Sequence, residues 1–175
     1  MITINHWTFY LLLIPLVIAI YTDIKKHKIY NWLTFPTLIV GLILHSINWG
    51  FLSSFLGFLI AFLVSLFLYA GIKFIAGGDV KLIAAIGAWV GKSLILNTLV
   101  WIFLCGGLLS LFQILRAGTF YITINKIKDF FIALIIPGMK ATNVVKESVN
   151  EYVPYGIAIS IGTILSIKYP NILGI

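Results

Sequence analysis

Two aspartates differ from the other acidic residues of this chain in their surroundings. Five residues are acidic, and three of them, Asp129, Glu147 and Glu151, fall in one long polar segment. Asp23 and Asp79 instead adjoin apolar runs. Two carboxylates that lie close together do not both ionise easily and share one proton. Such a pair supplies a base that activates water and an acid that protonates a leaving amine, which is aspartic protease chemistry.

This chemistry needs neither a metal nor a cofactor, and the sequence offers no convincing metal site. The three histidines, His6, His27 and His45, are scattered, and the single cysteine, Cys105, lies in an apolar run. Zinc sites require three or four His, Cys, Asp or Glu ligands that converge. We therefore expect no metal and no cofactor.

The elements that must position the two aspartates are membrane helices. The chain has 175 residues, of which 61% are hydrophobic and only 10% charged, whereas soluble domains contain roughly 25% charged residues. This composition predicts an all-α, polytopic helical bundle that forms a single integral membrane domain, residues 1–175. Because about 20 apolar residues cross the hydrocarbon core, we expect about six spans. They are placed at roughly 7–22, 33–49, 51–72, 79–91, 94–116 and 153–169.

The basic residues predict how this bundle is oriented. If the segment after the first span is cytoplasmic, only Lys92 and Lys168 fall outside, which leaves ten of the 12 Lys and Arg residues inside. This asymmetry follows the positive-inside rule. Both termini then face outward, and Asp23 and Asp79 emerge at one depth, at the cytoplasmic boundary of the cell membrane. The net charge of +7 is explained by these loops, so we expect contact with membrane lipid and none with nucleic acid.

One long segment separates the fifth and sixth spans. Residues 118–152 are predicted to form a cytoplasmic loop, and its apolar run FFIALIIPG is too short to cross the bilayer. Lysines flank this run on both sides. We expect it to lie along the inner interface, either as a basic segment against anionic lipid or as a lid over a substrate.

The local settings of the two aspartates differ. Asp79 is expected at or near a helix N-cap, where free N–H groups and the helix dipole favour the anion, and Asp23 at a helix C-terminus, which disfavours it. The sequence thus favours Asp79 as the base and Asp23 as the acid. Gly77 and Gly78 predict a flexible link or a close approach of a peptide backbone. Lys81 either steadies the charge of Asp79 or simply anchors the helix end.

The first aspartate belongs to a longer pattern. In the stretch YTDIKKHKIYNWLTFP, Asp23 precedes several basic residues, and Asn31 stands at the start of the next apolar run. This pattern resembles the first catalytic motif of the type IV prepilin peptidase family, which includes preflagellin peptidases. These are intramembrane aspartyl proteases of the GxGD class. Tyr30 takes the place of the proline that precedes the asparagine in the family motif.

Two further stretches resemble the same family. The stretch AGGDVKL is similar to its second motif and matches at Gly78, Asp79, Val80 and Lys81. Ala76 takes the place of the first glycine of that motif. The stretch VPYGIA is similar to the start of the last family helix, through Pro154, Tyr155 and Gly156.

The resemblance implies roles for these residues and a class of substrate. The catalytic residues would be Asp23 and Asp79. Residues that bind substrate or support the site would be Gly77, Gly78, Lys81, Asn31, Pro154, Tyr155 and Gly156. The substrate would be a prepilin or preflagellin-like protein, cleaved after its short basic leader at the cytoplasmic boundary. The chain has no four-cysteine zinc region, so the resemblance is to the short form, and we expect no methyltransferase activity.

Two other classes of function stay open at this point. A small membrane transporter could use paired acids to carry protons or cations, although such acids are expected near the bilayer midplane. A noncatalytic pilus-assembly subunit could use the same aspartates only as a helix cap or in an interface ion pair.

Overall fold

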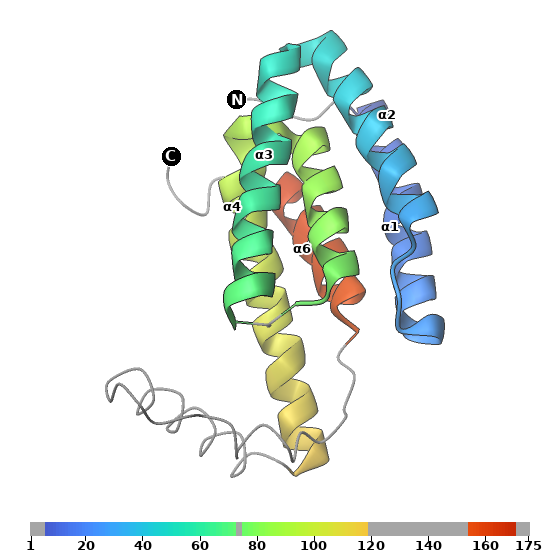
Figure 1. Ribbon diagram of the computed structural model, residues 1–175, viewed down its shortest axis with the longest axis vertical. Coiled ribbons are helices and arrows are strands. Elements are labelled where there is room, and N and C mark those ends of the chain that lie inside the picture. The colour runs from blue at the N-terminus through green and yellow to red at the C-terminus, as the bar shows by residue number, and fades with distance from the viewer. Residues whose placement is uncertain (1–5, 73–74, 119–153, 171–175) are drawn as a thin grey trace, which may run out of the picture. The chain divides into compact units, whose positions relative to one another are not determined.

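Helices account for nearly all of the described structure. The computed structural model describes residues 6–72, 75–118 and 154–170, so most of the predicted loop at 118–152 lies outside the described residues. The elements are α1 (His6–Lys26), α2 (Asn31–Trp49), α3 (Phe51–Phe67), the π-helical turn η1 (Leu68–Ile72), α4 (Gly77–Ala117) and α6 (Tyr155–Lys168) (Figure 1). The all-α prediction is confirmed for these residues.

The chain divides into two compact units. The first comprises residues 1–106 and 154–175, and the second comprises residues 107–153. The described part of the second unit is the end of α4 from Gly107 onward, followed by Gly118. Both candidate catalytic aspartates belong to the first unit.

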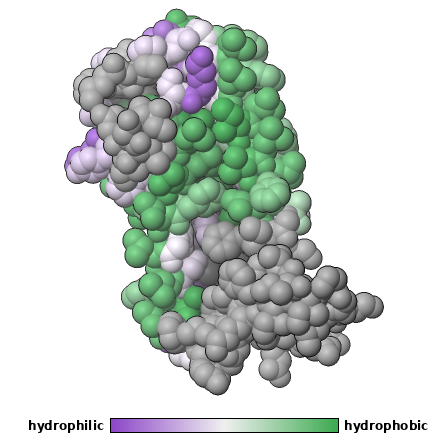
Figure 2. Space-filling model, turned by 90° about the vertical axis from the view of Figure 1, so that its left-hand side faces the viewer, coloured by the Kyte–Doolittle hydropathy of each residue, from purple (hydrophilic) through white to green (hydrophobic). Residues whose placement is uncertain are grey.

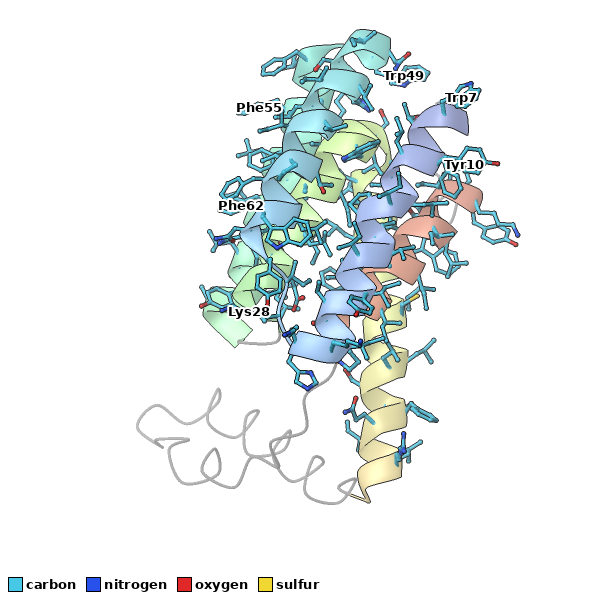
Figure 3. The ribbon with its side chains drawn as sticks, turned by 90° about the vertical axis from the view of Figure 1, so that its right-hand side faces the viewer. Trp7, Tyr10, Lys28, Trp49, Phe55 and Phe62 are labelled. Atoms are coloured by element: carbon cyan, nitrogen blue, oxygen red, sulfur yellow. The ribbon has the colours of Figure 1, made fainter. Side chains whose placement is uncertain are left out.

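The outer faces of the helices suit a lipid environment. Four described helical stretches are long and apolar enough to cross a membrane: Trp7–Lys26, Asn31–Trp49, Phe51–Ala70 and Gly77–Arg116. Hydrophobic side chains cover most of the described surface on the face that Figure 2 shows. Trp7 and Trp49 lie at the opposite end from Lys28 (Figure 3), as expected for aromatic residues at a membrane interface. The polytopic membrane class is thus supported, and the number of six spans stays a prediction.

Helix α4 is broken at Gly91. This residue has non-helical backbone angles, φ 69° and ψ 177°, in a region of φ that glycine adopts without a steric penalty. The ribbon reverses its direction at this point, so α4 consists of two segments that run side by side (Figure 1). The sequence predicts a turn between the fourth and fifth expected spans, either at residues 91–94 or near Asn97 and Thr98, and the structure places it at Gly91.

Side chains from two other helices satisfy the carbonyl groups next to this break. The Ser54 hydroxyl donates to the Ala88 carbonyl oxygen (2.7 Å), and His45 Nδ1 lies 3.0 Å from the Trp89 carbonyl oxygen. A carbonyl oxygen only accepts, so Nδ1 carries the proton, and the neutral ring can accept from the Ser53 hydroxyl through Nε2 (3.2 Å). The last turn before the break is therefore capped by α2 and α3.

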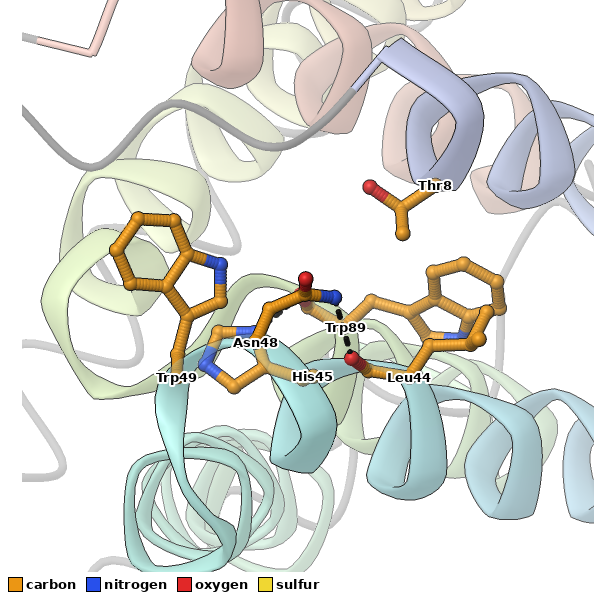
Figure 4. A pocket seen from close by; sticks show the side chains of 6 residues that line it. All are labelled: Thr8, Leu44, His45, Asn48, Trp49 and Trp89. Atoms are coloured by element: carbon orange, nitrogen blue, oxygen red, sulfur yellow. Dashed lines mark hydrogen bonds between the residues drawn. The ribbon is translucent and has the colours of Figure 1, made fainter.

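A small cavity lies beside this cap. His45 and Trp89 line it together with Thr8, Leu44, Asn48 and Trp49 (Figure 4). Its volume of about 10 Å³ has room for about one water molecule. The cavity is too small for a peptide.

Glycines allow the helices of the first unit to approach closely. A Cβ on Gly57 would meet the Gly87 carbonyl oxygen, and a Cβ on Gly87 would lie 2.6 Å from the Ala61 Cβ. A Cβ on Gly162 of α6 would lie 2.6 Å from the Ile102 Cα in the second segment of α4. Small residues are the usual means by which membrane helices pack backbone to backbone.

We expect Gly87→Ala to lower the free energy of unfolding by about 1–3 kcal/mol, because the new methyl group would meet the backbone of α3. Denaturant titration in detergent micelles measures this change. Gly107→Ala is the matched control, since a Cβ there meets no described residue within 4 Å. Equal stability of the two variants would contradict the close crossing of α3 and α4.

We expect His45→Phe to lower the free energy of unfolding by about 1–3 kcal/mol, because the buried Trp89 carbonyl oxygen loses its donor. The control is Asn48→Ala at the same cavity, since in the described part of the chain the exposed Asn48 amide bonds only to the Leu44 carbonyl oxygen of its own helix. The capping role of His45 would be wrong if the two variants proved equally stable.

Candidate active site

Asp23 lies near the end of α1 and is almost fully buried, with 1% of its surface exposed. Its Oδ2 accepts a hydrogen bond of 2.6 Å from the backbone N–H of Gly156. Gly156 is the second residue of α6, so the carboxylate of one helix meets the amino-terminal end of another. The sequence predicts the C-terminal position of Asp23 in α1 correctly, but it gives no sign of this second helix end.

Asp79 is the third residue of α4 and is also buried, with 4% of its surface exposed. Its Oδ2 accepts a hydrogen bond of 3.0 Å from the backbone N–H of Ala76, the residue just before the helix. A side chain at this position that reaches back to the N-cap N–H is half of a capping box. The predicted location at or near the N-cap is confirmed, and the alanine at 76 supplies the capped N–H.

The two carboxylates lie at the same end of the first unit. The charge of Asp23 acts on Asp79, which places the two side chains within electrostatic reach of each other. At this end α1 stops, while α2, the first segment of α4 and α6 begin (Figures 1 and 3). A pair of buried carboxylates in this arrangement can share a proton and act on a water molecule between them.

Gly77 and Gly78 have different surroundings. A Cβ on Gly78 would lie 3.1 Å from the Ile29 Cβ and 3.2 Å from the Ile29 carbonyl oxygen. Gly78 thus lies close to the protein's own connection between α1 and α2, and the approach of a substrate backbone at the tandem glycines stays a prediction. At Gly77 the nearest atoms are those of the Tyr69 ring, 3.9 Å away, so this residue has more space around it.

Lys81 and Asn31 bond to each other across two helices. The Lys81 ammonium group donates to the Asn31 Oδ1 atom (2.7 Å), and the bond is exposed. It ties the first turn of α4 to the first residue of α2. The bond tests neither of the two roles expected for Lys81, which stay predictions.

Pro154, Tyr155 and Gly156 form the start of α6, as the sequence predicts. Pro154 is the N-cap residue, and its carbonyl oxygen accepts from the Ile157 N–H (3.2 Å). Tyr155 is buried, with 6% exposed, and a Cβ on Gly106 would lie 2.7 Å from its hydroxyl oxygen. These three residues thus pack against α4 and, through Gly156, against Asp23.

Two contacts at this site are not predicted from the sequence: the burial of Ile29 against Gly78 and the backbone hydrogen bond of Ala76. Ile29 is buried, with 6% exposed, although it follows a run of basic residues. Ala76 contributes its backbone N–H, and the type of a residue does not indicate what its backbone N–H bonds to.

The described residues bring no three His, Cys, Asp or Glu side chains together in a group that could hold a metal ion. The functional groups that the site does offer are the two carboxylates, the backbone N–H groups bonded to them and the exposed Lys81 with its partner Asn31. This set supports acid and base chemistry on a bound water molecule.

Comparison with known protein families gives one match. Residues 10–111 match the type IV leader peptidase family, and this stretch is more than half of the 175 residues. The chain belongs to this family. It is therefore a leader peptidase of a multi-pass membrane type, as the resemblance of its motifs suggests. Comparison with curated proteins and with solved structures gives no significant match.

We expect the Lys81–Asn31 bond to contribute less than about 1 kcal/mol to stability, because exposed polar contacts are weak in water. A double-mutant cycle of Lys81→Ala and Asn31→Ala, measured by denaturant titration, isolates the pairwise coupling. A coupling of several kcal/mol would show instead that the bond is a main tie between α2 and α4.

Proposed function

We propose that this leader peptidase cleaves the basic leader from prepilin or preflagellin-like proteins at the cytoplasmic boundary, with Asp23 and Asp79 as an aspartic catalytic pair. The observation that carries the proposal is the pairing itself. Two carboxylates from helices far apart in the sequence are buried at one end of the first unit, within electrostatic reach of each other. Buried carboxylates near a membrane are costly and mark a functional site by default.

In this mechanism the two carboxylates share one proton and hold a water molecule. The charged carboxylate takes a proton from the water molecule, and the water oxygen attacks the scissile carbonyl carbon. The neutral member then gives its proton to the leaving amine, and the peptide C–N bond breaks. Neither step needs a cofactor.

The basic residues near the two aspartates support a cytoplasmic location of the site. Lys25, Lys26 and Lys28 follow Asp23 in the sequence, and Lys81 lies in the first turns of α4. Positive charge at this end agrees with the positive-inside rule. The leader of a substrate would therefore be cut where its hydrophobic helix enters the cytoplasmic side of the bilayer.

The neighbouring residues suit a supporting role. The space at Gly77 would let an unwound stretch of substrate backbone pass close to Asp79, since glycine has no side chain to obstruct it. The exposed bond between Lys81 and Asn31 joins the start of α4 to the start of α2. Unwinding is required because peptide bonds within a helix are shielded from attack.

One rival function has a specific observation in its favour. Each aspartate satisfies a backbone N–H at the beginning of a helix, which would also suit a noncatalytic assembly subunit. An isosteric Asp→Asn change separates the two functions, because an amide oxygen still accepts the hydrogen bond but cannot act as base or acid. A transporter is less consistent, since both aspartates lie at one end of the helices rather than midway along them.

We expect Asp23→Asn and Asp79→Asn each to reduce leader removal by at least about 100-fold, the scale of a lost acid or base. The measurement is the fraction of a co-expressed prepilin-type substrate that reaches its mature length. Asp129→Asn is the control, because it makes the same charge change at the third aspartate of the chain.

Normal processing by either single variant would rule out the catalytic pair. Normal processing by both, with membrane levels equal to those of the unmodified protein, would favour the assembly subunit.

A further inference from the structure

The amino-terminal end of helix α6 is capped, among the described residues, from another helix. The helix has 14 residues, and its N-cap, Pro154, makes no side-chain cap bond. The first N–H groups of a helix have no partner within the helix and must be satisfied from elsewhere when they are buried. The Gly156 N–H is one of these groups, and the Asp23 carboxylate of α1 accepts its hydrogen bond. Asp23 is thus the cap of a helix that lies far along the sequence.

This contact is short and closely fitted. The Gly156 bond to Asp23 is 2.6 Å long, against 3.0 Å for the Ala76 bond to Asp79. Hydrogen bonds to ionised acceptors are shorter and roughly twice as strong as those between neutral groups. A Cβ on Gly156 would lie 2.8 Å from the Asp23 Oδ2 and 3.1 Å from its Cγ. Only glycine at this position lets the carboxylate reach the backbone without a shift.

The helix dipole acts in the same direction. Within α1, Asp23 is near the C-terminus, the negative end of the dipole, which disfavours a carboxylate. At the start of α6 it meets the positive end of a second helix, with a direct N–H bond. The nearby Lys25 and Lys81 donate to other groups, the Tyr21 hydroxyl and the Asn31 amide oxygen.

We propose that the amino terminus of α6 is a positioning element of the active site, in which the Gly156 N–H holds Asp23 as the charged member of the pair. The inference rests on the proposed function and assigns a role to each aspartate. Asp23 is the base and Asp79 the acid, which is the reverse of the assignment that the sequence favours. Asp23 takes the proton of the attacking water as the new C–O bond forms. Asp79 gives its proton to the leaving amine nitrogen as the C–N bond breaks, and transfer of a proton from Asp23 to Asp79 restores the pair.

The hydrogen bond can be observed directly by NMR without a substrate. Tyr155–Gly156 is the only Tyr-Gly pair in the sequence. In full-length protein labelled with carbonyl-¹³C tyrosine and ¹⁵N glycine, an HNCO spectrum therefore contains a single peak, that of the Gly156 amide. We expect this amide proton to lie downfield and to exchange slowly with solvent in the unmodified protein.

The decisive variant is Asp23→Asn, which keeps the acceptor oxygen and removes only the charge. If Asp23 is ionised, the Gly156 amide proton moves upfield in Asp23→Asn and changes less in Asp79→Asn. If the peak is unchanged in Asp23→Asn, or moves more in Asp79→Asn, the assignment is overturned. Rapid exchange in the unmodified protein overturns it as well, and that measurement needs no variant. The ¹⁵N peaks of the other glycines report whether each variant is folded.

Cleavage assays test the positioning role of Gly156 separately. We expect Gly156→Ala to lower kcat at least tenfold with little change in KM, because it displaces Asp23 without touching the substrate path. Gly107→Ala, where a Cβ meets none of the residues that the structure describes, should leave both constants unchanged. An unchanged kcat in a folded Gly156→Ala protein would overturn the positioning role. The NMR result does not depend on activity, so a failure of the proposed function and a failure of this inference are distinguishable.

Discussion

The structure depends on one constraint: a helix end that is buried in apolar surroundings must find partners for its backbone N–H and C=O groups. Lipid offers none, so other helices provide them. Asp23 accepts from the start of α6, and the Asn97 amide donates to the carbonyl oxygens of Ser166 and Tyr169 at its other end. The short helix α6 is thus held at both ends by side chains of α1 and α4. His45 does the same for the break in α4 at Gly91.

This constraint also explains why the candidate site lies where several helices begin. A helix start offers free N–H groups and a positive dipole end, and both stabilise a carboxylate that would otherwise be costly to bury. Asp79 obtains this stabilisation from its own helix and Asp23 from α6. The two bonds differ in kind, because one is local in sequence and the other joins residues on separate helices. Under the proposed function, the groups that complete the fold at this end are also the groups that react.

Much of the fold follows from the sequence. The excess of apolar residues and the spacing of the apolar runs predict the helices, because these signals are local. The sequence also predicts a break in α4, but it leaves the position open between residues 91–94 and Asn97–Thr98. The two aspartates stand out through a local signal as well: acidic residues are rare beside the apolar runs of this chain. The π-helical turn at Leu68–Ile72 is not predicted, because its sequence is as apolar as the α-helix before it.

The sequence by itself determines that the chain is an all-helical membrane protein and that Asp23 and Asp79 are its exceptional acids, since composition and local pattern carry this information. The tertiary structure alone decides the surroundings of Asp23. Judged from its own helix, this residue lies at the unfavourable end of a dipole, whereas in the folded chain it caps α6. The partner is a backbone N–H more than 100 residues away (|i−j| = 133), and every residue except proline has such a group. A side-chain sequence therefore cannot reveal which N–H the carboxylate will meet.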